Sequence, residues 1–90
     1  MRLVQVQEPI HVTDVAARTF VPQTFTWRAR QHQVWKIDGV KDERIDRAEG
    51  PALRRVFSIR THTGMRCSIS YDELRKRWRM ETVNPKGVSA

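Results

Sequence analysis

The chain has 90 residues, enough for one small domain, and its 39% hydrophobic and 30% charged residues are typical of a folded protein. It holds 17 Lys and Arg against 10 Asp and Glu, a formal net charge of +7. This length excludes a large multi-step enzyme, and no stretch approaches the roughly 20 apolar residues of a membrane span. The first residues lack the apolar segment of a secretory signal, so we expect a cytoplasmic protein without a membrane partner.

The N-terminal segment is predicted to form a half-buried β-strand. Val4, Val6 and Val12 share an apolar face, and polar residues lie between them at the period-2 spacing of a strand. Pro9 interrupts this run and cannot donate a backbone hydrogen bond. We therefore expect an edge strand or a strand that contains a bulge. Residues 16–22 are expected to form a connection.

A second strand is predicted at residues 24–30, with Phe25 and Trp27 pointing inward. The pattern then changes phase before it resumes at Val34 and Ile37, as a tight turn or a bulge requires. Residues 38–52 are charged and contain Gly and Pro. We interpret them as a long hairpin loop with room for one helical turn.

The clearest hairpin is predicted at residues 55–71, with a three-residue loop at 62–64 that places Gly64 at a left-handed position. This register sets Arg60 directly opposite Arg66, and like charges in that arrangement destabilise a sheet. Either a bound anion or splaying of the two side chains into water would relieve the repulsion. We favour the anion.

Two structures are possible for residues 72–83. Ser70 and Glu73 match a capping box, and the spacing of Leu74 and Trp78 suits a short helix within residues 72–80. The alternation of Trp78 and Met80 with polar residues suits a strand, and we prefer a turn at 72–76 followed by a strand at 77–83. Residues 84–90 are expected to form a flexible tail.

These elements predict a single all-β domain over residues 1–83. We expect five or six strands in a half-open barrel or bent antiparallel sheet, of the Src-homology-3 or oligonucleotide-binding type, with at most one short helix near residues 72–80.

The excess positive charge is concentrated in two segments. Residues 28–36 carry +3 and residues 51–71 carry +4, whereas residues 37–50 carry −2. Basic surfaces of this kind commonly face nucleic acid, because they attract its phosphates, although they also serve solubility alone. We predict a non-catalytic nucleic-acid-binding module, with DNA preferred over RNA. The candidate binding residues are Arg28, Arg30, Trp35, Lys36, Arg60, Arg66, Arg75, Lys76, Arg77 and Arg79.

One aromatic side chain is expected to be exposed for stacking on bases. Trp27, Phe57 and Trp78 are needed in the core of so small a domain. Trp35 follows Val34 directly, and both cannot point inward on a regular strand. Trp35 or His32 is therefore the best candidate for an exposed ring.

Catalytic and metal chemistry are not expected. His11, His32 and His62 lack the spacing of a metal site, and Cys67 alternates with apolar residues as a buried side chain does. A single cysteine also excludes a disulfide framework and a cysteine-based zinc knuckle. No glycine-rich phosphate loop is present. We predict no enzyme activity, no cofactor and no metal.

The order of these signals resembles that of a known family. The first motifs on which the resemblance rests are Glu8-Pro9-Ile10-x-Val12 and Phe25-x-Trp27-Arg28-x-Arg30, the second followed by Val34 and Ile37. The later motifs are Arg55-x-Phe57-x-Ile59-Arg60 with Gly64, and Tyr71-Asp72 with Trp78-x-Met80. This pattern, over residues 8–83, resembles a small bacterial family of unknown function. Its members occur alone and at the C-terminus of the polymerase-like subunit of the translesion mutasome.

The resemblance implies a compact β domain, the bacterial cytoplasm and a link to DNA repair or damage tolerance, but no activity. Two features depart from the family pattern. Ala29 stands where the family usually has glycine in the Trp-Arg-x-Arg turn, and the family's tryptophans in the middle loop are absent. Because of Ala29, the type of the turn at residues 27–30 can differ from that in the family.

A protein–protein adaptor is the alternative function. Small barrels bind partners by adding a strand to an open edge, and the first strand with Pro9 is such a candidate edge. The partner would then be a protein of the DNA damage response. Salt separates the two functions, because phosphate contacts weaken steeply with salt and an apolar interface barely responds.

Overall fold

The computed structural model describes residues 3–84 and folds them into seven antiparallel β-strands of one sheet, with no helix in that part of the chain. The strands are β1 (Val4–Pro9), β2 (His11–Val15), β3 (Pro22–Trp27), β4 (Arg30–Arg47), β5 (Gly50–Thr61), β6 (Arg66–Asp72) and β7 (Arg77–Val83). Residues 3–84 therefore offer no helix that could cross a membrane.

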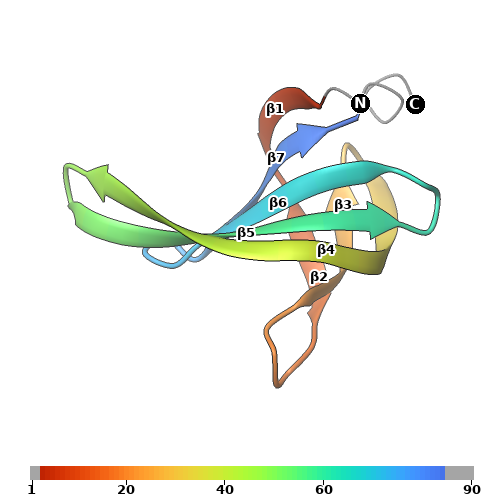
Figure 1. Ribbon diagram of the computed structural model, residues 1–90, viewed down its shortest axis with the longest axis horizontal. Helices are drawn as coiled ribbons and strands as arrows, with labels where there is room; N and C mark the ends of the chain where they lie inside the picture. The colour runs from red at the N-terminus through yellow and green to blue at the C-terminus, as the bar shows by residue number, and fades with distance from the viewer. Residues whose placement is uncertain (1–2, 85–90) are drawn as a thin grey trace.

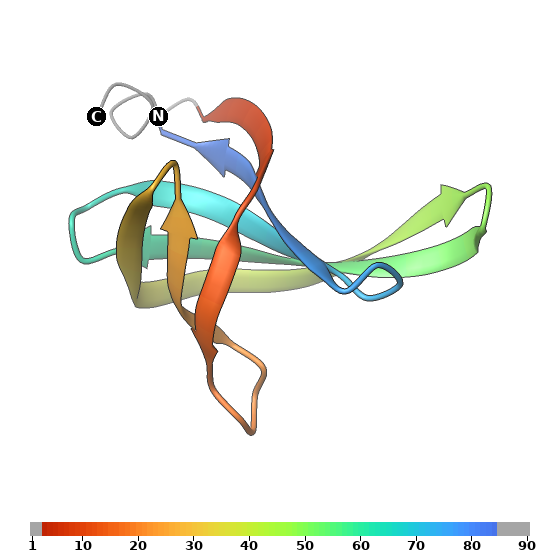
Figure 2. The same ribbon diagram turned by 180° about the vertical axis from the view of Figure 1, so that it is seen from behind.

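The sheet curls into a half-barrel (Figure 1, Figure 2). Its strand order is β1-β7-β6-β5-β4-β3-β2, so its two ends are consecutive segments of the chain. The predicted all-β class is confirmed. The strand count was slightly low, because the N-terminal strand changes neighbour at Ile10: β1 pairs with β7, and β2 pairs with β3. The expected irregularity near Pro9 is present as a bulge between Gln5 and Glu8.

The core lies on the inner face of the curled sheet. Phe25, Phe57, Ile69 and Met80 are at most 1% exposed, and Trp27 is also buried, as predicted. Trp78 was expected inside but is only half-buried. It closes one end of the core through ring contacts with residues 20 and 71, whose centroids lie 5.5 and 4.9 Å from its own.

The β5–β6 hairpin confirms the predicted register. The N–H of Thr61 donates to the carbonyl of Met65 at 3.0 Å, and Gly64 has a φ of +88°. This closes the three-residue loop at 62–64, and glycine is favoured at such a left-handed position. Arg60 pairs directly with Arg66.

The loop interpretation of residues 38–52 was wrong. Residues 38–47 belong to β4 and residues 50–52 begin β5, and the two strands pair without interruption from Val40 with Phe57 to Arg47 with Gly50. Opposite charges meet across this pairing: Arg55 donates to Asp42 at 2.8 Å, and Arg54 donates to Glu43 at 2.5 Å. Cross-strand ion pairs let charged residues occupy a two-stranded ribbon that has no deep core.

Residues 44–53 extend beyond the neighbouring strand β6 as a two-stranded arm, which we call the β4–β5 arm (Figure 1). The turn between β6 and β7 contacts the arm both near its tip and at its base. Arg47 forms an ion pair with Asp72, Arg75 donates to Glu49 at 2.8 Å, and the N–H of residue 73 donates to the carbonyl of residue 53 at 3.1 Å.

The chain between β6 and β7 is a turn, as preferred, and the helix considered for residues 72–80 is absent. Asp72 Oδ1 accepts the backbone N–H groups of Leu74 and Arg75, each at 3.1 Å, which stabilises the turn. A helix cannot continue beyond it, because Lys76 has a left-handed φ of 54°. Of the tail predicted at residues 84–90, only Asn84 is described: it is buried, and its N–H donates to the carbonyl of Arg66. Residues 85–90 lie outside the described residues.

Candidate nucleic-acid interface

Three candidate residues form a row on neighbouring strands, which we call the basic row: Lys36 on β4, Arg60 on β5 and Arg66 on β6. Lys36 pairs in register with Arg60, and Arg60 pairs with Arg66. Residues directly opposite each other point to the same face of a sheet, and neighbouring strands lie about 4.8 Å apart. The row therefore spans about 10 Å on the outer face.

Arg60 binds an anionic group of this chain, on the β4 side of the row and not between the two opposed arginines, where the expected anion stays a prediction. Arg60 Nε donates to Asp38 Oδ2 at 2.8 Å. This hydrogen bond, together with the charges of Arg60, Lys36 and Arg66, holds the pKa of the Asp38 carboxyl below its ordinary value. Asp38 reaches the row because it is a bulge residue: Ile37 and Gly39 pair with consecutive residues of β5, and Asp38 pairs with none.

Trp35 is exposed, as predicted, and lies beside Lys36. It is also a bulge residue, between the paired residues Val34 and Lys36, and it is 59% exposed. Its neighbours outline a hollow of about 490 Å³, whose lining includes Trp35, Lys36, Gln33, Asp14 and His62. The other candidate ring, His32, is half-buried and stacks on Phe25 with centroids 5.2 Å apart.

Arg28 is bound within the structure. Its guanidinium donates two hydrogen bonds to Glu8, at 2.9 and 2.7 Å, and lies 4.6 Å from the centre of the Trp27 ring. Trp27 Nε1 donates to the same carboxylate at 2.9 Å. These contacts fasten β1 to the turn between β3 and β4. Arg30 follows that turn, is exposed, and lies six residues, or about 20 Å, along β4 from Lys36.

The remaining candidates lie at the far end of β6. Arg75 donates to Glu49, and Arg79 donates to Glu81 of its own strand at 3.2 Å. Lys76 and Arg77 are exposed in and after the β6–β7 turn. Since β6 runs from Arg66 to Asp72, the residues of the turn are separated from the basic row by about 20 Å, and Arg79, which pairs with Ser70, by about 13 Å. The structure thus divides the ten candidates among three places.

Ion pairs identify the cations that are free to bind a ligand. Of the ten acidic residues, all but Asp14 and Glu73 form an ion pair with a basic residue of the described chain. Six basic residues within 3–84 have no such pair: Arg18, Arg30, Lys36, Arg66, Lys76 and Arg77. Two of the six belong to the basic row.

No group of three metal-binding side chains occurs within residues 3–84. Burial and the nearby charge of Arg30 lower the pKa of His32, and burial raises the pKa of the Cys67 thiol to about 12. Cys67 is therefore in its unreactive thiol form near neutral pH.

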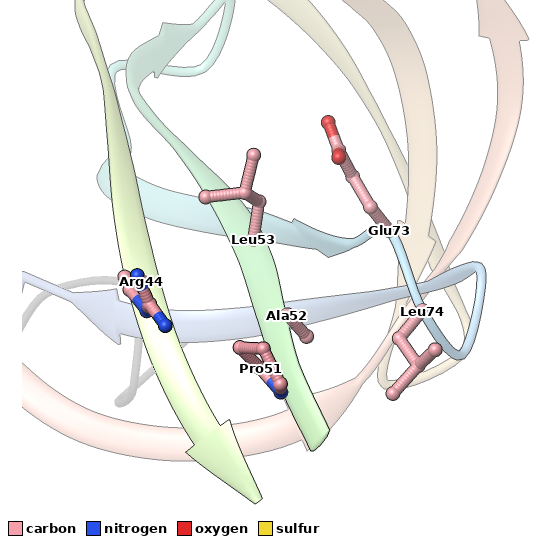
Figure 3. Close-up of a pocket in the computed structure, with 6 residues that line it drawn as sticks. All are labelled: Arg44, Pro51, Ala52, Leu53, Glu73 and Leu74. Carbon is pink, nitrogen blue, oxygen red and sulfur yellow. The ribbon is translucent and has the colours of Figure 1, made fainter. Parts of the chain in front are cut away.

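A second hollow, of about 440 Å³, lies between the β4–β5 arm and the β6–β7 turn (Figure 3). Figure 3 shows Pro51, Ala52 and Leu53 on β5 between Arg44 of β4 and residues 73–74 of the turn. Leu53 and Leu74 are each nearly half exposed. Its lining holds one basic and one acidic residue, Arg44 and Glu73, and includes no residue of the basic row.

No protein-family model, curated protein or solved structure matches the chain. The family resemblance drawn from the spacing of its aromatics and arginines therefore stays a prediction.

Sequence reasoning missed Glu8 and Asp38 as partners of candidate arginines. Glu8 is 20 residues from Arg28 and meets it only because the first strand changes neighbour at Ile10. The sequence did hold a signal that Asp38 could lie near the basic residues, because this acidic residue interrupts an apolar pattern two residues after Lys36. A bulge, however, cannot be located from that pattern alone.

Proposed function

We propose that this protein is a non-catalytic module that binds the phosphate backbone of nucleic acid through the basic row. The observation that carries the proposal is the alignment of Lys36, Arg60 and Arg66 on three neighbouring strands, with a single carboxylate among them and an exposed Trp35 beside them. Cations that are close together and unpaired gain the most from a polyanion.

Trp35 gives the proposed site a means of contacting bases. A ring that is 59% exposed on a strand bulge can stack on an unpaired base, whereas a duplex keeps its bases stacked on each other. The hollow beside Trp35 could hold a base edge, with Gln33 and Asp14 as hydrogen-bonding groups. This arrangement favours single strands over duplexes. Half-open barrels of the oligonucleotide-binding type bind single strands on such faces, and we extend that comparison to this chain.

The biological setting is also part of the proposal. We propose DNA as the preferred nucleic acid, a role in DNA repair or damage tolerance, and a location in the bacterial cytoplasm. These parts of the proposal rest on the resemblance of residues 8–83 to the small bacterial family named above. Binding measured in parallel on DNA and RNA of the same sequence tests the first of these.

Two double variants with the same change in net charge test the site. Lys36→Glu with Arg66→Glu removes the two unpaired cations of the row, and Lys76→Glu with Arg77→Glu removes two at the far end of β6. We expect the first variant to lose at least about tenfold in affinity for single-stranded DNA, since it removes two phosphate contacts and adds repulsion. The second variant should lose much less. Equal losses would mean that net charge, and not the basic row, attracts the DNA.

A protein–protein adaptor is the second candidate, because an unpaired strand edge is present. The predicted edge at Pro9 on β1 is one such edge, and within the described residues β4 also has a neighbour on one side only beyond Gln33. A partner that adds a strand there would bind mainly through backbone hydrogen bonds, with little dependence on salt.

A further inference from the structure

Beyond Gln33, strand β4 pairs with β5 on one side and has no strand on the other within the described residues. We call residues 34–47 the free edge of β4. Figure 2 shows its outer part, together with β5, extending away from the rest of the sheet. Unpaired backbone groups on such an edge can pair with a strand of another chain unless something protects them.

The charges at the outer end of this edge have a specific symmetry. The sequence Glu43-Arg44-Ile45-Asp46-Arg47 has opposite signs at equal distances on either side of Ile45. In an antiparallel pair of two copies centred on Ile45, Arg44 of one copy lies opposite Asp46 of the second copy. Glu43 likewise lies opposite Arg47 of the second copy. Each charged residue of this segment then meets a residue of opposite sign.

The same sequence disfavours the neighbouring registers. Residues directly opposite in an antiparallel pair share a face, so a two-fold axis between two such strands must pass beside one residue, which then faces its own copy. An axis at Asp42, Glu43, Arg44, Asp46 or Arg47 places that charge opposite itself. Among positions 42–47, only the axis at Ile45 avoids this repulsion, and it places two apolar side chains together.

Arg44 and Asp46 are available for such pairing. Their side chains are 71% and 84% exposed, and within one copy they form only a loose ion pair at 3.5 Å. Exposed pairs of this kind contribute little to the fold. Glu43 and Arg47, by contrast, already bind Arg54 and Asp72. The exposed pair is therefore the part of the edge that can be altered without disturbing the arm.

We propose that the free edge of β4 pairs with the same edge of a second copy, in antiparallel register centred on Ile45. The dimer would contain a continuous four-stranded ribbon in the order β5-β4-β4-β5. Its two-fold interface is self-complementary and small, so monomer and dimer should exchange with protein concentration. This inference does not depend on nucleic-acid binding. The dimer would, however, occupy the edge of β4 that an adaptor partner would need.

Charge swapping tests the register. Sedimentation velocity over about a hundredfold range of concentration, without nucleic acid, measures the dimer fraction. Arg44→Asp and Asp46→Arg each place like charges opposite each other twice in the dimer, and we expect each to weaken it at least about tenfold. The double variant Arg44→Asp/Asp46→Arg restores opposite charges and should dimerise as the unmodified protein does.

Arg18→Asp is the matched control, because it makes the same charge change at an exposed, unpaired site between β2 and β3. It should leave the dimer intact. The proposal is overturned if the unmodified protein is monomeric throughout the range. It is also overturned if either single variant dimerises normally, or if the double variant remains as weak as the single ones.

Discussion

At the scale of single residues, Asp38 determines how much positive charge the basic row presents. Its carboxylate accepts a hydrogen bond from Arg60 and lies within the field of Lys36 and Arg66. The bond relieves the repulsion between opposed arginines and fixes one guanidinium. It also cancels one of the three charges that would attract phosphate, so Asp38 favours the fold at the expense of affinity.

Asp38→Asn is therefore expected to bind DNA more tightly. Removing a negative charge from beside the phosphate site should raise affinity about threefold to tenfold at low salt. Fluorescence anisotropy with labelled single-stranded DNA measures this. Glu73→Gln, which neutralises an acid without an ion pair in the distant β6–β7 turn, is the control and should change affinity little. An unchanged or weaker affinity in Asp38→Asn would place the DNA elsewhere.

Ala29 occupies a backbone conformation that suits glycine. The two residues between β3 and β4, Arg28 and Ala29, have φ values of 51° and 62°, and two left-handed residues in a two-residue hairpin indicate a type I′ turn. Glycine is the usual residue at the second position of this turn. The structure therefore places alanine in a left-handed position of this hairpin.

Ala29→Gly should consequently stabilise the protein. A left-handed conformation costs a non-glycine residue about 1–2 kcal/mol, and glycine's extra freedom in the unfolded chain offsets part of the gain. We expect an increase of about 0.5–1 kcal/mol in the free energy of unfolding, measured by urea denaturation. Ala17→Gly, the same change at an exposed residue without positive φ, should be neutral or destabilising. An equal response at both sites would contradict the turn assignment.

At the scale of elements, ion pairs hold the long β4–β5 hairpin together. Arg54 bridges Glu43 and Glu81, at 2.5 and 3.1 Å, and thereby joins β4, β5 and β7. The hydrogen bond from Arg54 lowers the pKa of Glu43. For Asp72, burial acts to raise the pKa, but hydrogen bonds from the backbone of Arg75 and the side chain of Arg47 outweigh it and lower the value.

These lowered pKa values predict acid sensitivity. A carboxyl whose pKa is lower in the folded state stabilises the fold at pH values above its unfolded pKa, and the stabilisation is lost as pH falls through the folded value. Thermal melting should therefore vary little at higher pH and decline once pH falls below the ordinary values of 4.5 for Glu43 and 3.8 for Asp72. The Glu43→Gln variant should have a lower melting temperature at neutral pH, and its melting temperature should fall less on acidification. A melting temperature that is constant into this acid range would contradict the assigned pairs.

The elements show where sequence patterns suffice and where they fail. The β5–β6 hairpin could be predicted to the residue, because Gly64 fixes its loop and its apolar side chains lie on one face. The outer halves of β4 and β5 could not, because charged residues predict a loop unless their cross-strand partners are known. Likewise, the exposure of Trp35 followed from its neighbour Val34, but the approach of Asp38 to Arg60 required the bulge.

At the scale of the whole molecule, the net charge differs from the charge that is available to bind a ligand. The formal charge of +7 counts every ionisable residue of the sequence, but most basic residues of the described chain form ion pairs with acidic residues. The fold concentrates charge on one face where unpaired cations lie in register. Lys36 and Arg66 do so on either side of Arg60. The number of phosphates contacted should therefore be close to the size of this row.

The salt dependence of DNA binding measures that number most directly. The unmodified protein would be titrated into fluorescent single-stranded DNA at several salt concentrations from about 50 to about 200 mM, with duplex DNA in parallel. Two phosphate contacts, or three if phosphate displaces Asp38 from Arg60, predict a slope between about −1.4 and about −2 for the logarithm of affinity against the logarithm of salt on single strands. Binding to single strands should also be tighter than to duplexes. No binding at the lowest salt, or binding that does not change with salt, would contradict a phosphate-binding function for the basic row.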